Sequence, residues 1–292
     1  MPLRAQAAPV EPKAANLQVY RDPAVVSHYA SLDYLTACER HLFDTYLTPG
    51  MAILDVGVGG GRTTPYLFRK ASRYVGVDYS EEMIRLCRSK FPQLEFLVAD
   101  ASDLSKFADR SFDAIVFAFN GLDYVLPAEK RRQCLRECER VLRADGVLMF
   151  SSHNPRSILV RPSWDPQILR ALAGRMCPQP GVGFRVLLGA LLAAKSVHAF
   201  LRALAGSVVR IFRRVPTIAF WSGDGCLFDS AHGGLATHYW TPRHAVAEAS
   251  SFGLRFETLL GDDYPRRSRE FTTDWYYYVF TKVESAVGKS CA

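Results

Sequence analysis

The chain of 292 residues lacks most of the features that assign a sequence to a class at once. None of its seven cysteines forms a C-x-x-C pair, and their odd number and scattered positions indicate reduced thiols instead of a disulfide framework. No uninterrupted apolar run reaches the roughly 18 residues of a membrane span. Residues 1–24 also lack an apolar core of signal-peptide length. We therefore expect a loosely ordered tail over residues 1–24 and a cytoplasmic protein.

Acidic residues are nearly absent from one segment of the chain. Between Pro155 and Gly223 the sequence has ten lysines and arginines and one acid, Asp165, so this segment carries +9. The whole chain carries +7, which leaves −2 for the remainder. With 49% hydrophobic and 22% charged residues, the composition is that of a globular protein in which a single segment is basic.

Glycine is concentrated in one short stretch. Four glycines fall among the five residues 57–61, directly after the apolar run Met51 to Val56 and before a second apolar stretch of helical character. This pattern predicts a strand, a tight turn and a helix. Such a turn presents free backbone N–H groups at a helix N-terminus, where a ligand with acceptor groups can bind. Arg62 occupies the position of the third glycine in a dinucleotide-binding fingerprint, which argues against a nicotinamide cofactor.

The spacing that is present is Asp55-x-Gly57-x-Gly59-x-Gly61, with a carboxylate two residues before the first glycine. It resembles motif I of the class I S-adenosylmethionine-dependent methyltransferases, in which this loop holds the methionine portion of the cofactor. A carboxylate beside the loop suits the ammonium of that portion and would repel a pyrophosphate. The resemblance implies an α/β fold with a doubly wound, seven-stranded, mostly parallel sheet. It also implies S-adenosyl-L-methionine as the cofactor.

Two further strands are expected to end in acids. Arg73 to Asp78 predicts a strand, and Asp78 follows Gly57 by 21 residues, the spacing that puts a carboxylate on the ribose hydroxyls in Rossmann-like units. Leu94 to Ala99 predicts the next strand, and the resemblance implies that Asp100 after it binds the adenine amino group. Tyr29 resembles an aromatic near the methionine carboxylate, although a packing role fits it as well. The other cofactor contacts expected from the resemblance are Tyr79, Met83, Ala101 and Phe117.

The loop after the predicted fourth strand, Phe112 to Ala118, is expected to meet the methyl acceptor. Its sequence F-N-G-L-D-Y resembles the Asn-bearing loop of small-molecule N- and O-methyltransferases, although an Asn-Gly step can also be a simple turn. Asn120 offers a donor and an acceptor that can orient a substrate. Asp123 is the nearest carboxylate able to take its proton, and Tyr124 is expected beside the substrate.

The predicted fifth strand, Val147 to Ser152, leads to His153 and Asn154 at the same edge of the sheet. Histidine has an unperturbed pKa of about 6.5, so His153 can act as a base near neutral pH. A structural role, with the ring bonded to a loop carbonyl, fits equally well. The catalytic residues expected are His153, Asp123 and Asn120. The substrate-binding residues expected are Asn120, Tyr124, Asn154, His238 and Tyr239.

Residues 155–240 form an insertion that the resemblance leaves unmatched. A basic amphipathic helix is predicted within it, because four basic residues share one side of a helix and apolar residues fall opposite. These basic residues are Lys195, Arg202, Arg210 and Arg213. Three interpretations remain open: a lid over the substrate, a peripheral membrane contact through residues 186–214, and a nucleic-acid surface. The last is disfavoured because the chain has no RNA-module motif.

The chain is thus divided into the tail, a core over 25–154, the inserted helical lid over 155–240, a return to the core over 241–284 and a second tail over 285–292. Strands Leu254 to Leu260 and Trp275 to Lys282 are expected to complete the sheet. The function predicted is methyl transfer to an N or O atom of a small molecule, without a metal. The alternatives are a methyltransferase acting on tRNA or another macromolecule, and a non-catalytic partner subunit of the same fold.

Overall fold

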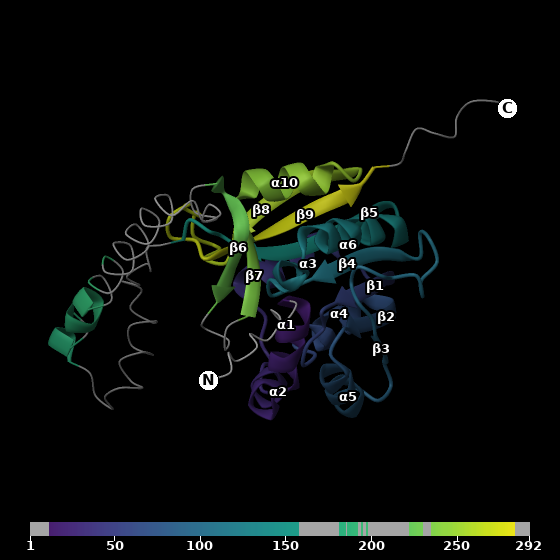
Figure 1. The fold of residues 1–292 in the computed structure, drawn as a ribbon, viewed down its shortest axis with the longest axis horizontal. Helices are drawn as coiled ribbons and strands as arrows, with labels where there is room; N and C mark the ends of the chain where they lie inside the picture. Colours follow the sequence, from purple (N-terminus) through teal and green to yellow (C-terminus); the bar gives the residue numbers. More distant parts are fainter. Residues whose placement is uncertain are drawn as a thin grey trace, which may run out of the picture.

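The computed structural model describes residues 12–157, 181–184, 186–191, 194, 197, 222–229 and 235–283. Its centre is a seven-stranded sheet with the order β3-β2-β1-β4-β5-β9-β8 (Figure 1). The four pairs formed among β1 to β5 are parallel, and β9 is antiparallel to both β5 and β8. The chain therefore has the doubly wound, mostly parallel α/β fold predicted from its sequence.

The strands of this sheet are β1 (Met51–Val56), β2 (Ala71–Asp78), β3 (Glu95–Val98), β4 (Phe112–Phe117), β5 (Leu142–His153), β8 (Leu254–Gly261) and β9 (Trp275–Lys282). The helices are α1 (Pro12–Arg21), α2 (Pro23–Ala30), α3 (Ala37–Tyr46), α4 (Thr64–Lys70), α5 (Glu81–Lys90), the 3₁₀ turn η1 (Gly121–Tyr124), α6 (Ala128–Val141) and α10 (Pro242–Ser250). Strand β5 begins before the predicted Val147, because the chain already pairs with β4 ahead of the turn at Asp145, whose φ is 59°.

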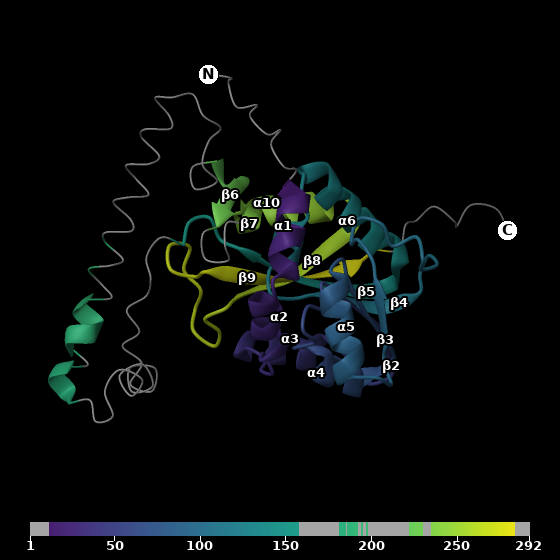
Figure 2. The ribbon, with the colours of Figure 1, turned by 60° about the horizontal axis from the view of Figure 1, so that its bottom comes forward.

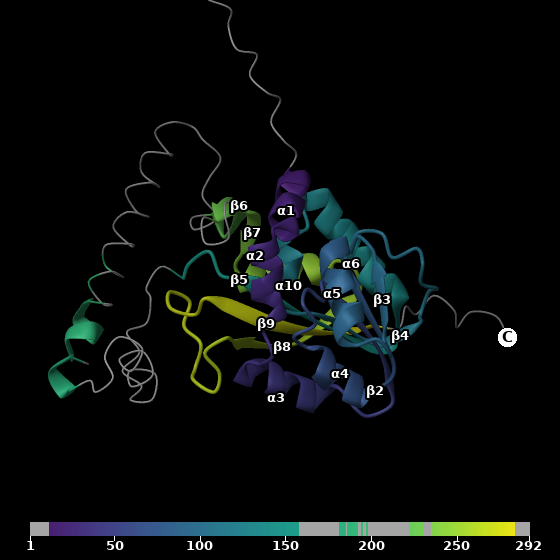
Figure 3. The same ribbon diagram turned by 90° about the horizontal axis from the view of Figure 1, so that it is seen from below.

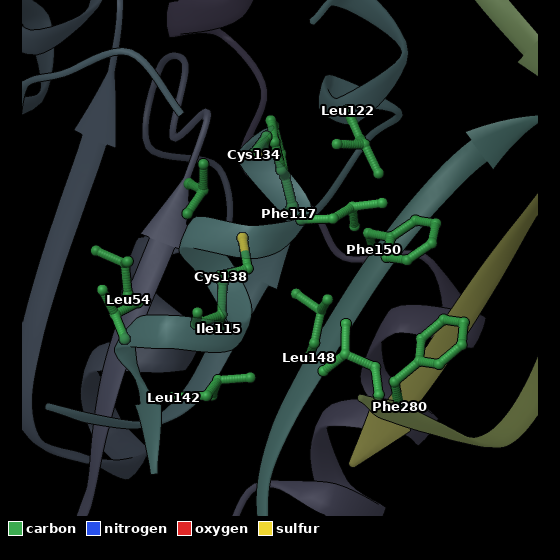
Figure 4. Close-up of a cluster of buried hydrophobic side chains, with 14 of the residues drawn as sticks. Leu54, Ile115, Phe117, Leu122, Cys134, Cys138, Leu142, Leu148, Phe150 and Phe280 are labelled. Carbon is green, nitrogen blue, oxygen red and sulfur yellow. The ribbon is translucent and has the colours of Figure 1, made fainter. Parts of the chain in front are cut away.

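Apolar side chains pack on both faces of the sheet, because successive residues of a strand point to opposite sides. On one face, Ile115 and Phe150 pack under α6 and α10, and Figure 4 shows Cys134 and Cys138 of α6 among these side chains. Both cysteines are buried free thiols, in agreement with the reduced cysteines expected from the sequence. On the other face, Val116 and the other alternate residues pack against α3, α4 and α5. Figure 3 shows α3 and α4 side by side along the sheet. A sheet covered on both sides leaves the carboxyl ends of β1 to β5 as the place for a ligand.

The N-terminal segment is more ordered than the sequence suggested. A loosely ordered tail was expected up to residue 24, but α1 occupies residues 12–21 and α2 follows from Pro23. Asp22 caps α2, since its carboxylate accepts a hydrogen bond of 2.7 Å from the backbone N–H of Ala24. The composition of this segment did not predict the helix, because α1 packs on a distant strand, β7 (Leu235–Trp240), and no local pattern reveals that contact.

The C-terminal part of the insertion is also different from the expected helical lid. Residues Asp224–Asp229 (β6) and Leu235–Trp240 (β7) form an antiparallel hairpin that packs on α1, η1 and β5. The structure describes helical residues at 182–184 and 186–191, and the basic residues of the predicted amphipathic helix lie outside the described part. Within the described residues, no helix is both long and apolar enough to cross a membrane. The other boundaries of the predicted division stay predictions.

Candidate active site

The glycine loop between β1 and α4 needs its glycines for two reasons. Gly57, Gly59 and Gly61 have φ of 64°, 53° and 78°, a region in which a side chain is strained. In addition, a Cβ on Gly57 would lie 2.7 Å from the ring of Phe117, and one on Gly60 would lie 2.3 Å from the carbonyl oxygen of Tyr29. The loop is therefore packed tightly between β4 and the C-terminal turn of α2, and the predicted strand, turn and helix are confirmed.

A pocket of about 900 Å³ opens beside this loop at the carboxyl ends of β1 to β4. Most residues predicted to contact the cofactor line it. These are Tyr29, Gly57, Gly59, Asp78, Tyr79, Met83, Asp100, Ala101 and Phe117. The structure thus brings together residues from five segments of the chain in one cavity.

Two of the predicted cofactor residues support the loop from outside this lining. Asp55 is buried, and its Oδ2 accepts hydrogen bonds from Thr63 Oγ1 at 2.7 Å and Tyr74 Oη at 2.8 Å. Burial raises the pKa of Asp55 to about 6, although these two donors oppose the shift. Gly61 faces α5, where an added Cβ would lie 2.8 Å from the ring of Phe91. Asp55 and Gly61 therefore fix the shape of the loop and do not reach the pocket.

Asp78 reaches the pocket and also binds the loop. Its Oδ2 accepts a hydrogen bond of 2.9 Å from the N–H of Gly59, and its Oδ1 accepts one of 2.9 Å from the N–H of Ser80. Burial raises the pKa of Asp78 to about 6, and the backbone donors of Ser80, Gly59 and Tyr79 oppose that shift. The carboxylate thus ties the end of β2 to the glycine loop, and it faces the cavity with acceptor oxygens.

Arg62, which stands in place of a third dinucleotide glycine, anchors a buried network that sequence analysis missed. It donates two hydrogen bonds to the Glu39 carboxylate of α3, at 2.5 and 2.7 Å, and a third to the carbonyl oxygen of Tyr34 at 2.9 Å. Tyr277 Oη also donates to Glu39, at 2.8 Å. The guanidinium lies 4.6 Å from the centre of the Phe119 ring, so the network connects the glycine loop to the acceptor loop.

The acceptor loop after β4 has a strained backbone that aims Asn120 at His153. Phe119 and Asn120 have φ of 56° and 63°, which is uncommon for side chains of this size. The Asn120 N–H donates to Ser151 Oγ at 2.7 Å, and its side-chain amide lies 3.1 Å from His153 Nε2. Asn120 Oδ1 is buried and has no hydrogen-bond partner among the described residues.

Asp123 and His153 form a tight pair at the end of β5. His153 Nδ1 lies 2.7 Å from Asp123 Oδ2, which also accepts the His153 backbone N–H at 2.8 Å, while Ser152 Oγ donates to Oδ1 at 2.5 Å. A carboxylate only accepts, so Nδ1 carries the proton; Nε2 accepts from the Asn120 amide and holds the lone pair. Asp123 is fully buried, whereas the His153 side chain is 20% exposed.

In this arrangement Asp123 and His153 are not equivalent. Both carboxylate oxygens of Asp123 are hydrogen-bonded, to Ser152 and to His153, so the carboxylate lies behind the imidazole. His153 presents the basic nitrogen, and Asn120 is the side chain next to it. In the sequence, this arrangement is visible only as three polar residues that follow two predicted strands.

Aromatic rings connect this pair to the pocket. Tyr124 has its ring centre 6.4 Å from that of His153, and Tyr239 of β7 has its ring centre 5.1 Å from the same imidazole. Tyr20 of α1, which sequence analysis did not single out, lines the pocket and lies 6.3 Å from Tyr124. Tyr20 belongs to the segment that was expected to be a tail, so no pattern marked it.

Two predicted substrate residues are used elsewhere. Asn154 is buried, and its amide donates to the carbonyl oxygens of Glu270 and Thr273, which fixes the loop before β9. His238 lies next to Tyr239 on β7 and therefore points to the opposite face, where its Nε2 lies 2.5 Å from Asp224 Oδ1. Neither side chain is brought to His153 by the structure.

Comparison with known proteins agrees with this geometry. A family model described as a methyltransferase domain matches residues 54–150. A demethylmenaquinone methyltransferase of Thermotoga maritima is 39% identical over 100 residues, which are 34% of this chain and 42% of the relative. A probable S-adenosylmethionine-dependent methyltransferase of Mycobacterium tuberculosis is 31% identical over 116 residues, 40% of each protein. The chain thus spans less than half the length of these relatives.

Solved structures with a similar fold cover more of the chain. A 1,6-didemethyltoxoflavin-N1-methyltransferase of Burkholderia thailandensis, solved with its substrate and S-adenosylhomocysteine, has a TM-score of 0.55 at 14% identity and covers 97% of this chain and 94% of its own. An S-adenosylmethionine-dependent methyltransferase of Mesorhizobium loti has a TM-score of 0.54 at 17% identity, covering 84% and 98%. At such identities the likeness establishes the fold. Residues 54–150 therefore match a methyltransferase domain, and the chain has the fold of solved S-adenosylmethionine-dependent methyltransferases.

Proposed function

We propose that this protein transfers a methyl group from S-adenosylmethionine to an N or O atom of a small molecule, with His153 as the general base. The observation that carries the proposal is the Asp123–His153–Asn120 chain of hydrogen bonds beside the glycine-loop pocket. General bases in enzymes are commonly imidazoles held in one tautomer by a buried carboxylate.

The pocket fits the cofactor in its chemistry. Gly57 and Gly59 bring the backbone close to the cavity without a Cβ, and Asp78 has carboxylate oxygens suited to a pair of ribose hydroxyls. The buried Tyr79 Oη has no hydrogen-bond partner among the described residues, which suits a site completed by a ligand. Met83 and Ala101 offer apolar surface for a purine. When bound, S-adenosylmethionine supplies an activated methyl group on its sulfonium.

The chain's own residues then act on the acceptor. As the acceptor binds, the Asn120 amide gives up its hydrogen bond to Nε2. His153 Nε2 then takes the proton from the attacking hydroxyl or amine, and the Asp123 carboxylate stabilises the imidazolium that forms. Asn120 lies beside Nε2 and orients the acceptor through its unpaired Oδ1. Because the methyl group is already activated, alignment of the two reactants contributes most of the acceleration.

A small-molecule acceptor is supported by the names of two similar proteins, a demethylmenaquinone and a didemethyltoxoflavin methyltransferase. Action on tRNA or another macromolecule and service as a non-catalytic partner are the competing functions. Steep salt dependence of nucleic-acid binding would indicate action on tRNA. Binding of cofactor without any turnover would indicate a non-catalytic partner.

The deciding experiment separates binding from turnover. Calorimetry with S-adenosylhomocysteine is expected to give binding by the wild type and by His153→Ala, and none by Asp78→Ala. A mass-shift screen of a metabolite extract with S-adenosylmethionine is expected to give a methylated product with the wild type only. Equal loss of binding and turnover in His153→Ala would refute its role as the base. Unchanged binding in Asp78→Ala would refute the cofactor site.

A further inference from the structure

Two elements outside the matched methyltransferase domain meet above the site. Helix α1 and strand β7 lie side by side, as Figure 1 and Figure 2 show from two directions. They are joined by Asn16, whose Nδ2 donates to the carbonyl oxygen of Ala236 at 2.9 Å and whose Oδ1 accepts from the Ala236 N–H at 3.0 Å. Asn16 is 1% exposed, so both hydrogen bonds are shielded from water. The side chain pairs with β7 as a neighbouring strand would.

Each of the two elements contributes an aromatic side chain to the site. Tyr20 lies four residues after Asn16 and thus on the same side of α1. Its ring centre is 5.9 Å from those of Tyr29 and Tyr79, and the residue is half-buried, so it is part of the wall between pocket and solvent. On β7, Tyr239 lies three residues after Ala236 and packs on the imidazole of His153. Helix α1 therefore borders the cofactor pocket, and strand β7 borders the imidazole of His153.

If α1 and the β6–β7 hairpin moved independently, each of them would need its own contacts with the core. At the pocket end of α1, Tyr20 packs against the rings of Tyr29, Tyr79 and Tyr124, whereas Asn16 is buried against the hairpin. The hairpin in turn packs on η1 and β5, which carry Asp123 and His153. Movement of α1 away from the pocket must break the two Asn16 hydrogen bonds or pull β7 with it.

We propose that α1 and the β6–β7 hairpin act as one cover, in which Asn16 is the positioning residue that holds Tyr20 over the cofactor pocket and Tyr239 beside His153. The cover gives cofactor and acceptor a common gate, because opening it exposes both ends of the site. The proposal rests on the proposed function only for the identity of the ligand, since the joint between α1 and β7 exists without one.

Hydrogen exchange of the full chain, without ligand, tests the joint. Asn16→Leu keeps the volume of the side chain and removes both hydrogen bonds; Gln18→Ala, at an exposed position of the same helix, is the matched control. Strand β6 is the decisive reporter, because the described bonds of Asn16 reach only β7. Loss of two buried hydrogen bonds is expected to speed exchange in both α1 and β6 by roughly tenfold or more in Asn16→Leu. Unchanged exchange in β6 would overturn the common cover.

The rate of S-adenosylhomocysteine dissociation tests the gate. Asn16→Leu is expected to raise this rate by roughly tenfold together with β6 exchange, and Tyr20→Ala is expected to raise it without loosening β6. Asn16→Asp places a buried carboxylate oxygen against the Ala236 carbonyl oxygen, so a rate at least as high as that of Asn16→Leu is expected. An unchanged dissociation rate in Asn16→Leu would overturn the gate. A wild type that does not bind S-adenosylhomocysteine would refute the proposed function, and the exchange experiment would still decide the joint.

Discussion

The buried Arg62–Glu39 pair offers the sharpest test of how the glycine loop is held. Glu39 is fully buried and Arg62 is 8% exposed, so water cannot replace either partner. Glu39→Gln keeps the shape of the side chain and an oxygen for the Thr36 cap, but turns an N–H group toward the guanidinium. Removal of one partner from a buried pair costs about 3–5 kcal/mol, because the remaining charge is left uncompensated. In a chain of this size the loss lowers the melting temperature by roughly 10 °C.

Urea unfolding of four proteins measures this effect. The wild type, Glu39→Gln, Arg62→Met and the double variant form a cycle, and the double variant is expected to lose less than the two single variants together, by about 1–3 kcal/mol. Arg85→Ala, which removes an exposed ion pair with Glu82, is the control and should cost less than about 1 kcal/mol. Additive losses, or a cost of Glu39→Gln no larger than that of the control, would refute the argument.

Three further expectations follow from the same geometry. Since burial raises the pKa of Asp78 to about 6, affinity for S-adenosylhomocysteine should fall as pH decreases below about 6, and Asp78→Asn should bind weakly at every pH; calorimetry between pH 5 and 8 checks this. For folding, the pH dependence has the opposite sign, because burial disfavours the ionised carboxylate of Asp78. Its contribution to stability is therefore present at pH values below the ordinary pKa of an aspartate and is lost as the pH rises to about 6. Gly60→Ala should abolish S-adenosylhomocysteine binding and lower the melting temperature, because its Cβ would overlap the Tyr29 carbonyl, whereas Gly253→Ala, with open space around the added Cβ, should leave binding intact. Deletion of residues 186–214 distinguishes the interpretations of the insertion: reduced turnover indicates a lid, and loss of flotation with anionic vesicles at full turnover indicates a membrane contact.

Local patterns predicted the parts of this protein that depend on neighbours in the chain. Strands β1 and β9 have the predicted bounds, because an apolar run bordered by turn residues has one stable arrangement in a covered sheet. The glycine loop was predicted for a similar reason, since positive φ and close backbone approach leave little choice of residue. The acids Asp78 and Asp100 line the pocket because the ends of parallel strands meet at one edge.

The roles of individual polar residues did not follow from the sequence. Asn154 and His238 were expected beside the substrate, yet each is bound to groups that arrive from other segments. Asp123 stands at the site as predicted, but its oxygens are directed at His153 and Ser152. A polar side chain at a strand end can face a ligand or a neighbouring loop, and its own sequence context is the same in both cases.

The sequence by itself determined the doubly wound sheet, the glycine loop and the pocket at the carboxyl ends of its strands, because periodicity and turn chemistry act over a few residues. Only the tertiary structure decided how that pocket is enclosed. Asn16 meets Ala236 across 220 residues, and Asn120 meets His153 across 33, so neither contact has a local signature. Such pairs form when the fold brings their segments together and burial requires each polar group to find a partner.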